Sequence, residues 1–158
     1  MAKRKTWKEK LANANGLPKV EPLTGKWMEQ HGGGTIAIPA PMEVDAIMKQ
    51  VPPGKLITIN EIREIVAEKH GATMGCPITS GIFAWIAAHA AEEDSVAGEE
   101  EITPYWRTLK VGGELNPKYP GGVDYLRAQL ESEGHTVITK GSRYFVKDYQ
   151  GSLVKTLS

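Results

Sequence analysis

Val51-Pro-Pro-Gly-Lys-Leu-Ile-Thr-Ile-Asn-Glu-Ile62 is the stretch of sequence that decides the fold. Its Pro52-Pro53-Gly54 segment ends one helix, because proline cannot continue a helix and glycine readily terminates one. That preceding helix is predicted from apolar residues that recur at helical spacing, namely Met42, Val44, Ile47, Met48 and Val51. Downstream, Asn60 is a suitable N-cap for a second helix that ends at Gly71. The stretch therefore predicts a helix, a sharp turn and a new helix.

A third helix is predicted after a short connection, from about Ile78 to Ala91. It is dense in alanine and carries Ile82, Phe83 and Ile86. Two helices joined by a short turn that contains glycine match a helix-turn-helix. Because many paired helices bind no nucleic acid, this pattern alone favours ordinary helix packing over DNA binding.

The N-terminal segment is predicted to be less regular. Thr6, followed three residues later by Glu9, fits a capping box, so a short helix to about Asn13 is expected. Prolines and glycines punctuate residues 16–41, which predicts an irregular lead-in with one short strand at Thr35–Ile38.

The C-terminal third predicts one helix followed by strands. Val123, Leu126 and Leu130 recur at helical spacing, and Gly134 closes that helix. Beyond it, alternating patterns between turn residues predict strands at His135–Thr139, Arg143–Lys147 and Leu153–Leu157.

Composition is that of a soluble globular protein, since 41% of the 158 residues are hydrophobic and 24% are charged. No apolar run approaches the roughly 20 residues of a membrane span, and the first ten residues lack the apolar stretch of a signal peptide. The single cysteine, Cys76, rules out an internal disulfide and a multi-cysteine metal site. We therefore expect a cytoplasmic protein with no metal and no cofactor.

The charges sum to zero, which argues mildly against a strong general affinity for nucleic acid. Their distribution is uneven. Residues 3–10 form a basic arm, which is either a solvated tail or a contact to phosphate. From Glu92 to Glu101 acidic residues occur without a basic one, which is typical of a solvated loop turned away from phosphate.

Three segments, in one order, resemble the C-terminal DNA-binding domain of alkylguanine-DNA alkyltransferases. Val51–Ile62 is similar to the family's VPxGxVxTYxxI motif, which precedes its helix-turn-helix. Ile102-Thr-Pro-Tyr-Trp-Arg107 occupies the place of the family's IPCHR active-site motif. Tyr119-Pro-Gly-Gly122 and Leu130-Glu-Ser-Glu-Gly134 are similar to its YxGG…LLxxEG ending. The helix-turn-helix pattern lies between the first two segments, as in the family.

The resemblance and the predicted elements together imply an α+β fold built on a winged helix-turn-helix-like core. The alkyltransferase-type DNA-binding domain is placed at residues 42–135. An N-terminal extension, comprising the basic arm and the irregular lead-in, is placed at residues 1–41, and a C-terminal β-hairpin or small sheet at residues 136–158.

The reactive positions of the family are changed in this chain. The family's cysteine accepts the alkyl group and the neighbouring histidine activates it, whereas Tyr105 and Trp106 stand at these positions. A phenol titrates at about pH 10 and an indole is no nucleophile, so neither replaces an activated thiolate. Glu133 matches the family's glutamate but has no histidine to orient. The chain thus resembles the alkyltransferase-like proteins, which keep the fold without the cysteine, bind alkylated guanine in DNA and flag it to excision repair.

The resemblance also implies which residues contact DNA. These lie before the first helix of the motif and at the start of the second: Thr58, Ile59, Pro77, Ile78, Thr79, Ser80 and Gly81. Ile59 replaces a family tyrosine, and no arginine stands near Ile78, where the family inserts one into the base stack. An apolar wedge would act there instead. Thr79, Ser80 and Gly81 are equally consistent with tight helix packing.

A base pocket is implied at a second group of residues, Tyr105, Trp106, Arg107, Tyr119, Gly121, Gly122 and Glu133. Their aromatic rings would either stack on an extruded base or plug the pocket, and ordinary core packing explains the same residue types.

The expected partner is duplex DNA, with alkylated guanine as the implied lesion and excision-repair proteins as further partners, and we expect a monomer with no membrane contact. Two alternatives stay open. An active methyltransferase would use Cys76 as its acceptor. A degenerate domain would serve protein–protein contact, which the neutral charge and the acidic run allow.

Overall fold

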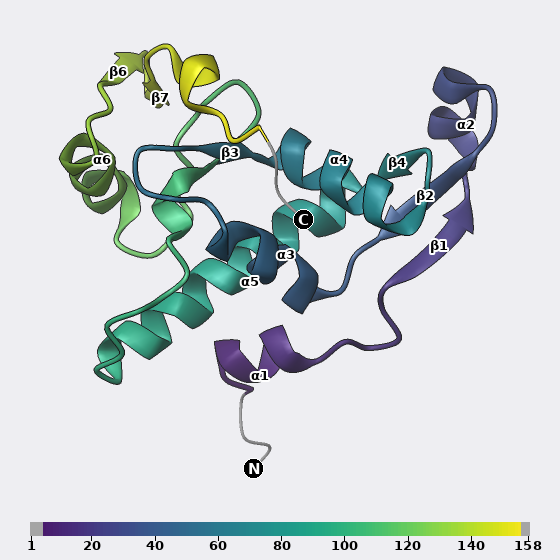
Figure 1. Cartoon of the computed structure of the whole chain (residues 1–158), viewed down its shortest axis with the longest axis horizontal. Coiled ribbons are helices and arrows are strands. Elements are labelled where there is room, and N and C mark those ends of the chain that lie inside the picture. The colour runs from purple at the N-terminus through teal and green to yellow at the C-terminus, as the bar shows by residue number, and fades with distance from the viewer. Residues whose placement is uncertain (1–4, 156–158) are drawn as a thin grey trace.

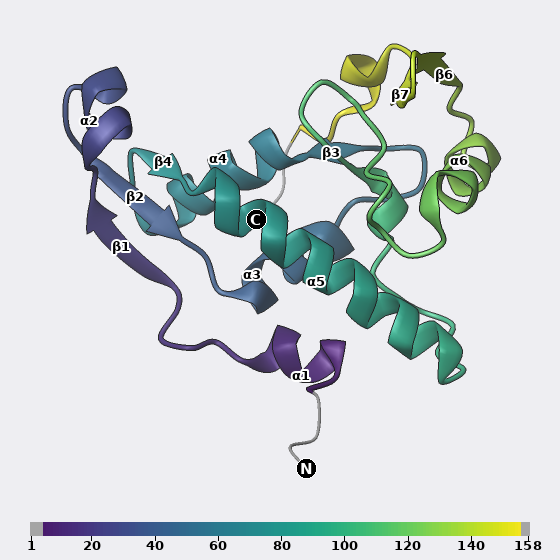
Figure 2. The same ribbon diagram turned by 180° about the vertical axis from the view of Figure 1, so that it is seen from behind.

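The long helix α5 (Pro77–Val96) runs through the middle of the fold, and three of the other helices pack against it (Figure 1). The computed structural model describes residues 5–155. Helices α1 (Trp7–Ala12), α3 (Pro41–Lys49) and α4 (Ile59–His70) all contact α5. Small side chains let these helices approach closely, because the buried face of α5 is mostly alanine: Ala84, Ala87, Ala88, Ala90 and Ala91. Figure 2 shows α2, β1 and β2 at one end of the molecule and α6 with β6 and β7 at the other.

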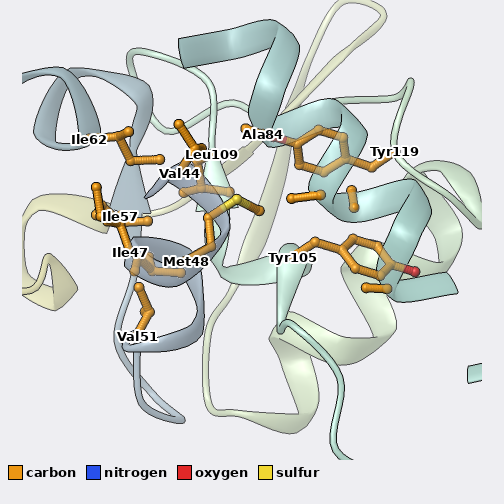
Figure 3. Packing of buried hydrophobic residues seen from close by; sticks show 14 of the residues in the cluster. Val44, Ile47, Met48, Val51, Ile57, Ile62, Ala84, Tyr105, Leu109 and Tyr119 are labelled. Atoms are coloured by element: carbon orange, nitrogen blue, oxygen red, sulfur yellow. The ribbon is translucent and has the colours of Figure 1, made fainter. Parts of the chain in front are cut away.

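The hydrophobic core lies between α3, α5 and the segments that flank them (Figure 3). The predicted helical stripe of α3 is confirmed for Val44, Ile47 and Met48, which are buried there. Met42 is exposed instead, and Val51 is buried beyond the end of the helix. The buried stripe residues of α3 meet Ile57, Ile62 and Leu109, which are buried as well. Burying each such side chain stabilises the fold by about 1.5–3 kcal/mol before entropy is subtracted.

The helix-turn-helix consists of α4 and α5, but the cap of α4 differs from the prediction. Thr58 is the N-cap residue, and both its backbone N–H and its hydroxyl donate to Glu61 Oε1, at 2.7 and 2.6 Å. Asn60 lies inside the helix, where its side-chain oxygen accepts from Arg63. Both Asn60 and Thr58 are good cap residues by type. Thr58 is favoured because Glu61, three residues after it, accepts a hydrogen bond from its backbone N–H. Gly71 ends α4 in the left-handed conformation, as predicted.

The lead-in is more regular than the sequence predicted. The strand at Thr35–Ile38 is confirmed as β2. It pairs antiparallel with β1 (Lys19–Pro22) and parallel with β4 (Met74–Gly75), and α2 (Gly25–His31) joins β1 to β2. The prediction missed β1 because every residue of that strand is exposed, so it shows no alternation of buried and exposed positions.

The C-terminal third begins with the 3₁₀ helix η1 (Tyr105–Arg107), followed by β5 (Thr108–Leu109) and α6 (Gly122–Ser132). Strand β5 pairs parallel with β3 (Ile57–Thr58). The predicted hairpin is present as β6 (Val137–Lys140) and β7 (Arg143–Val146).

The third predicted strand, Leu153–Leu157, does not form as a strand in the part that the structure describes. After β7 the chain makes the 3₁₀ helix η2 (Tyr149–Ser152), and Leu153 forms an isolated bridge to Leu56. The Val154 N–H donates to the Leu56 carbonyl in this bridge, at 2.9 Å. Thr156 and Leu157 lie outside the described residues.

The acidic run is only partly the solvated loop that was predicted, because Glu92–Val96 form the last turns of α5. Glu93 accepts hydrogen bonds from the backbone N–H groups of Trp7 and Lys8, at 2.9 and 3.0 Å. Lys8 also pairs with Asp94, 2.8 Å away. A carboxylate at a helix N-terminus is favourable, so this acidic end holds α1 in place. The predicted helix and its Thr6 cap are thereby confirmed.

These contacts involve residues of the predicted basic arm. Its described part is packed against the C-terminal end of α5 and partly neutralised there. Lys3 and Arg4, the other basic residues of the arm, lie outside the described residues. Within residues 5–155, no helix is long and apolar enough to cross a bilayer.

Candidate nucleic-acid interface

A groove of about 640 Å³ opens beside the N-terminal half of α5. One face of that helix forms its wall, at positions spaced three or four residues apart: Pro77, Ile78, Gly81, Ile82 and Trp85. Ile78 is 67% exposed and Ile82 is 46% exposed. Large apolar side chains in such a row, left uncovered, are typical of a surface that another molecule covers.

The opposite wall of the groove comes from the loop that follows β5 and from the hairpin. Backbone bridges hold this loop, since Glu114 pairs with both Lys110 and Phe145 of β7. Ile59 and Arg63 of α4 line the groove where the helix-turn-helix begins. The loop and the hairpin supply the remaining lining residues: Lys110, Val111, Glu114, Asn116, Lys118, Tyr119 and Arg143.

The groove carries more positive than negative charge. Its cations are Arg63, Lys110, Lys118 and Arg143, and its one lining carboxylate is Glu114. Arg143 donates to Glu114 through Nε and Nη2, at 3.1 and 2.7 Å. These hydrogen bonds hold the pKa of the Glu114 carboxyl below its ordinary value. The groove is therefore suited to an anionic partner that also has apolar faces.

The predicted DNA contacts divide into a first set that lines the groove and a second set that lies outside it. Ile59, Pro77, Ile78 and Gly81 line the groove. Thr58 is buried as the cap of α4 and lies outside it. At Gly81 an added Cβ would meet nothing within 4 Å, so tight helix packing does not explain this glycine.

Thr79 and Ser80 belong to the second set, because their hydroxyl oxygens are buried on the inner side of α5. Neither oxygen has a hydrogen-bond partner among the described residues. The predicted DNA contact through Thr79 and Ser80 therefore differs from the placement of their hydroxyls, and helix packing, the alternative, accounts for the buried Ser80.

The predicted base pocket also differs from the groove, because Tyr105 points into the core (Figure 3). Tyr105 is only 3% exposed, and its hydroxyl donates to the carbonyl of Pro120 at 3.3 Å. Its ring packs near Tyr119 and Tyr125, with centroids 6.1 and 6.0 Å away. Burial raises the pKa of both Tyr105 and Tyr119. Tyr105 thus fills space as the plugged pocket would, while Tyr119 still lines the groove.

Trp106, Arg107 and Glu133 form a structural unit and do not line the groove. The Trp106 indole N–H donates to Glu133 Oε2 at 3.1 Å, and Arg107 donates to both carboxylate oxygens. Burial opposes a charge on Glu133, yet the hydrogen bonds from Arg107 and Trp106 hold the pKa of its carboxyl below the ordinary value. The glutamate thus orients an arginine and an indole.

Gly121 and Gly122 are likewise explained by local structure. Gly121 has φ +83°, and a Cβ there would lie 2.5 Å from the Cβ of Tyr125. Gly122 begins α6 with φ +67°. Both glycines permit the turn from Tyr119 into α6, and neither lines the groove.

Cys76 is the N-cap residue of α5 and is partly buried. It is not among the side chains that line the groove, and its backbone N–H donates to Ala37. Across residues 5–155, no group of three or more His, Cys, Asp or Glu side chains is arranged to hold a metal ion.

Sequence reasoning missed eight lining residues, namely Ile82, Trp85, Lys110, Val111, Glu114, Asn116, Lys118 and Arg143. The loop residues gave no signal, because only the fold brings them to α5. For the helix a signal existed. Ile78, Ile82 and Trp85 recur at helical spacing on the side of α5 away from the buried alanines. A helix with apolar residues on two sides is expected to pack against another surface on each side, so this second row indicated a contact beyond the core.

An α+β domain with a helix-turn-helix, a hairpin and an adjoining groove is the class of fold that these elements define. No family model and no curated protein matches the chain.

Two solved structures share the fold. One is Atl1 of S. pombe in complex with damaged DNA containing O6-carboxymethylguanine, 18% identical, with a TM-score of 0.52 over 73% of this chain and 94% of that one. The other is S. pombe ATL in complex with DNA, 17% identical, with the same TM-score and coverage. At these identities the likeness concerns the fold, and it confirms the predicted α+β fold and its similarity to the alkyltransferase-like fold.

Proposed function

We propose that the chain is a non-catalytic DNA-binding protein that holds an extruded, alkylated guanine in the groove beside α5. The observation that carries the proposal is the row of exposed Ile78 and Ile82 at a groove flanked by cations. Proteins that bind the minor groove often insert apolar side chains between base steps and contact phosphates with basic ones. Both S. pombe structures of the same fold contain DNA, which supports this partner.

Helix α5 has the features that close approach to a duplex requires. Gly81 leaves the helix surface low beside Ile78, so that backbone and sugar can come near. Lys110 and Lys118 stand on the opposite wall, where they would meet the phosphates on either side of the extruded nucleotide. The proposal therefore gives the apolar row the role of opening the stack and the cations the role of positioning the duplex.

The groove also has room for a base. Its volume of about 640 Å³ lies within the roughly 300–1,000 Å³ of small-molecule sites. Alkylated guanine is the favoured occupant because its weakened pairing lowers the cost of extrusion. Since Tyr105 and Trp106 replace the family's reactive pair, the base would be held without transfer. A monomer in the cytoplasm that presents the bound lesion to excision-repair proteins completes the proposal.

A substitution at Gly81 tests the proposal without removing any packing. Gly81→Leu places a side chain into open groove space, and leucine favours the helix more than glycine does. We expect it to weaken binding to a duplex containing O6-methylguanine at least tenfold while the midpoint of thermal unfolding stays level or rises. Ser95→Leu is the matched control, because Ser95 is exposed near the other end of the same helix.

The titration compares that duplex with an otherwise identical one containing guanine. Tighter binding of the alkylated duplex by the wild type, lost in Gly81→Leu and kept in Ser95→Leu, supports the proposal. Equal affinity for the two duplexes contradicts lesion recognition. No binding of either at low salt contradicts DNA binding altogether and favours the protein–protein alternative.

A further inference from the structure

Helix α1 is joined to the groove by a stack of three rings. Trp7 of α1 lies nearly parallel to the imidazole of His89, with centroids 4.4 Å apart and 22° between the planes. Trp7 and Trp85 form a T-shaped pair, with centroids 4.8 Å apart and 84° between the planes. Trp85 and His89 are themselves in edge contact, at 5.1 Å. Trp85 is also a wall of the groove, so the N-terminal extension reaches the candidate interface through one side chain.

Two members of this stack hold the opposite wall of the groove. The indole N–H of Trp85 donates to the carbonyl of Lys118 at 3.3 Å. His89 Nε2 lies 3.3 Å from the same oxygen, and because a carbonyl only accepts, Nε2 carries the proton there. Lys118 immediately precedes Tyr119, and both line the groove. One carbonyl therefore links the loop to α5.

Residues 116–119 make mainly local backbone hydrogen bonds at this point, while the Tyr119 ring is buried in the core. The backbone N–H of Lys118 donates to the side chain of Asn116, and that of Tyr119 to the backbone of Asn116, so these hydrogen bonds are local. The Lys118 carbonyl is the point at which residues 116–119 hydrogen-bond to α5. The buried Tyr119 ring anchors one end of this wall in the core, and the donors from α5 fix the position of the backbone at Lys118.

Helix α1 is in turn firmly docked. The Glu93 carboxylate accepts from two of its backbone N–H groups, and Leu11 is buried in the core. Lys10 Nζ lies 4.1 Å from the centre of the Trp7 ring, on which a cation is attracted to the π face. These contacts hold Trp7 against Trp85 and His89.

We propose that Trp7 is a positioning residue for the groove: it orients Trp85 and His89, whose N–H groups hold the Lys118 carbonyl and with it the wall at residues 116–119. The importance of that wall for an extruded base rests on the proposed function. The mechanical link itself does not, because it concerns only contacts within the chain. Without Trp7, both rings lose a partner and their N–H groups are no longer directed at one oxygen.

Hydrogen exchange of the full-length protein without DNA tests the link. In Trp7→Ala we expect the backbone amides of residues 116–122 to exchange about fivefold faster or more, the size that one lost hydrogen bond gives. Trp7→Phe keeps a ring against His89 and restores most of the protection. Trp27→Ala, in α2 at the far end of the molecule, is the matched control and leaves these amides unchanged (Figure 2). Unchanged exchange in Trp7→Ala, with its helix content intact, overturns the proposal.

A second variant keeps the test decisive if Trp7→Ala unfolds. Trp85→Phe preserves a ring against Trp7 but lacks the N–H that reaches Lys118. We expect faster exchange at residues 116–122 and little change at α1, whereas unchanged exchange at the loop overturns the proposal.

DNA binding supplies the independent arm. Trp7→Ala should reduce the preference for the O6-methylguanine duplex about three- to tenfold, with affinity for the plain duplex retained, because a loosened wall loses about one hydrogen bond's worth of the base's fit. A wild type without lesion preference refutes the proposed function, while the exchange measurement still decides the role of Trp7. A wild-type preference that Trp7→Ala keeps refutes only the role of Trp7.

Discussion

Arg107 and Glu133 form a two-pronged ion pair between η1 and the residue that ends α6. The guanidinium Nε lies 2.9 Å from Glu133 Oε1, and Nη2 lies 2.6 Å from Oε2. The third nitrogen donates to the carbonyl of Val51 at 2.7 Å. The two side chains are only 11% and 12% exposed. One arginine therefore joins the end of α6, the segment before β5 and the turn after α3.

Removing one partner of this pair should be costly. Arg107→Met leaves the Glu133 carboxylate buried with the Trp106 indole as its remaining side-chain donor. We expect the free energy of unfolding to fall by about 3 kcal/mol, at the lower end of the range for breaking a buried pair. The double variant Arg107→Met/Glu133→Leu should lose less, because no buried charge remains. Urea unfolding measures both, and a single variant as stable as the wild type contradicts the assignment.

The same pair predicts an acid dependence of stability. The folded-state pKa of Glu133 is below its ordinary value, so the ionised form is favoured in the folded protein. Its contribution is therefore present above about pH 4.3, the unfolded value for glutamate, and is lost as the pH falls through the folded pKa. Between about pH 6 and pH 3, the wild type should lose more stability than Glu133→Gln. Parallel pH profiles would contradict this.

Trp106 should matter for stability and not for lesion preference. Its indole donates to Glu133 and lies outside the groove. Trp106→Phe removes one hydrogen bond to a charged group and should lower the free energy of unfolding by about 1.5–3 kcal/mol. The ratio of affinities for alkylated and plain duplex should stay within about twofold of the wild type. A tenfold loss of that ratio would return Trp106 to the base pocket.

The fold was largely predictable because its helices obey local rules. Val44, Ile47 and Met48 form an apolar stripe, Gly71 can take a left-handed conformation, and Thr6 has its glutamate three residues on. Each of these signals lies within a few residues of the element that it predicts. Strand β1 lacked such a signal, since all of its residues are exposed and its pairing partner β2 lies further along the chain.

The site was less predictable because it depends on distances between segments remote in the chain. The motif resemblance placed Tyr105 and Trp106 in a pocket. Both side chains are larger than the cysteine and histidine that they replace, and Tyr105 donates to the Pro120 carbonyl while Trp106 donates to Glu133. Lys118 and Arg143 reach the groove only through the loop and the hairpin. No spacing along the sequence indicates that proximity.

Cys76 should accept no alkyl group. It caps α5 and is not among the residues that line the groove, so we expect a base held there not to meet its Sγ. Incubation with DNA carrying radiolabelled O6-methylguanine should leave the protein unlabelled, and Cys76→Ser should bind the same DNA with unchanged affinity. Stoichiometric label that Cys76→Ser abolishes would establish a transferase instead.

Duplex binding should depend modestly on salt. If the groove's cations, Arg63, Lys110, Lys118 and Arg143, each neutralise about one phosphate, the slope of log K against log salt is about −3 to −4. Lys118→Gln should make the slope less steep by about 0.9, and its backbone carbonyl stays available to Trp85. Lys26→Gln, exposed on α2, is the control and should leave the slope unchanged. A slope near zero in the wild type would exclude phosphate contacts at the groove.

Ile78 should act as the wedge that keeps the vacated stack open. It is the most exposed of the large apolar side chains that line the groove, and it stands at the first turn of α5, beside Pro77. Because water surrounds it in the free protein, Ile78→Ala should leave the free energy of unfolding within about 0.5 kcal/mol of the wild type. In the complex, Ile78→Ala removes the side-chain carbons beyond Cβ from between two bases. At about 0.8 kcal/mol per buried CH₂, we expect the affinity for the alkylated duplex to fall about ten- to fiftyfold.

A fluorescent base analogue next to the lesion separates wedging from simple contact. With 2-aminopurine at that position, the wild type should raise the emission as the stack opens, and Ile78→Ala should raise it less even at saturating protein. Val96→Ala is the matched control: Val96 is 82% exposed at the other end of α5, so losing it changes helix and solvent exposure in a similar way without touching the groove. Equal emission and equal affinity in wild type and Ile78→Ala would mean that the duplex is opened by another part of the molecule, and the exposed row on α5 would then serve only as a flat contact to the sugars.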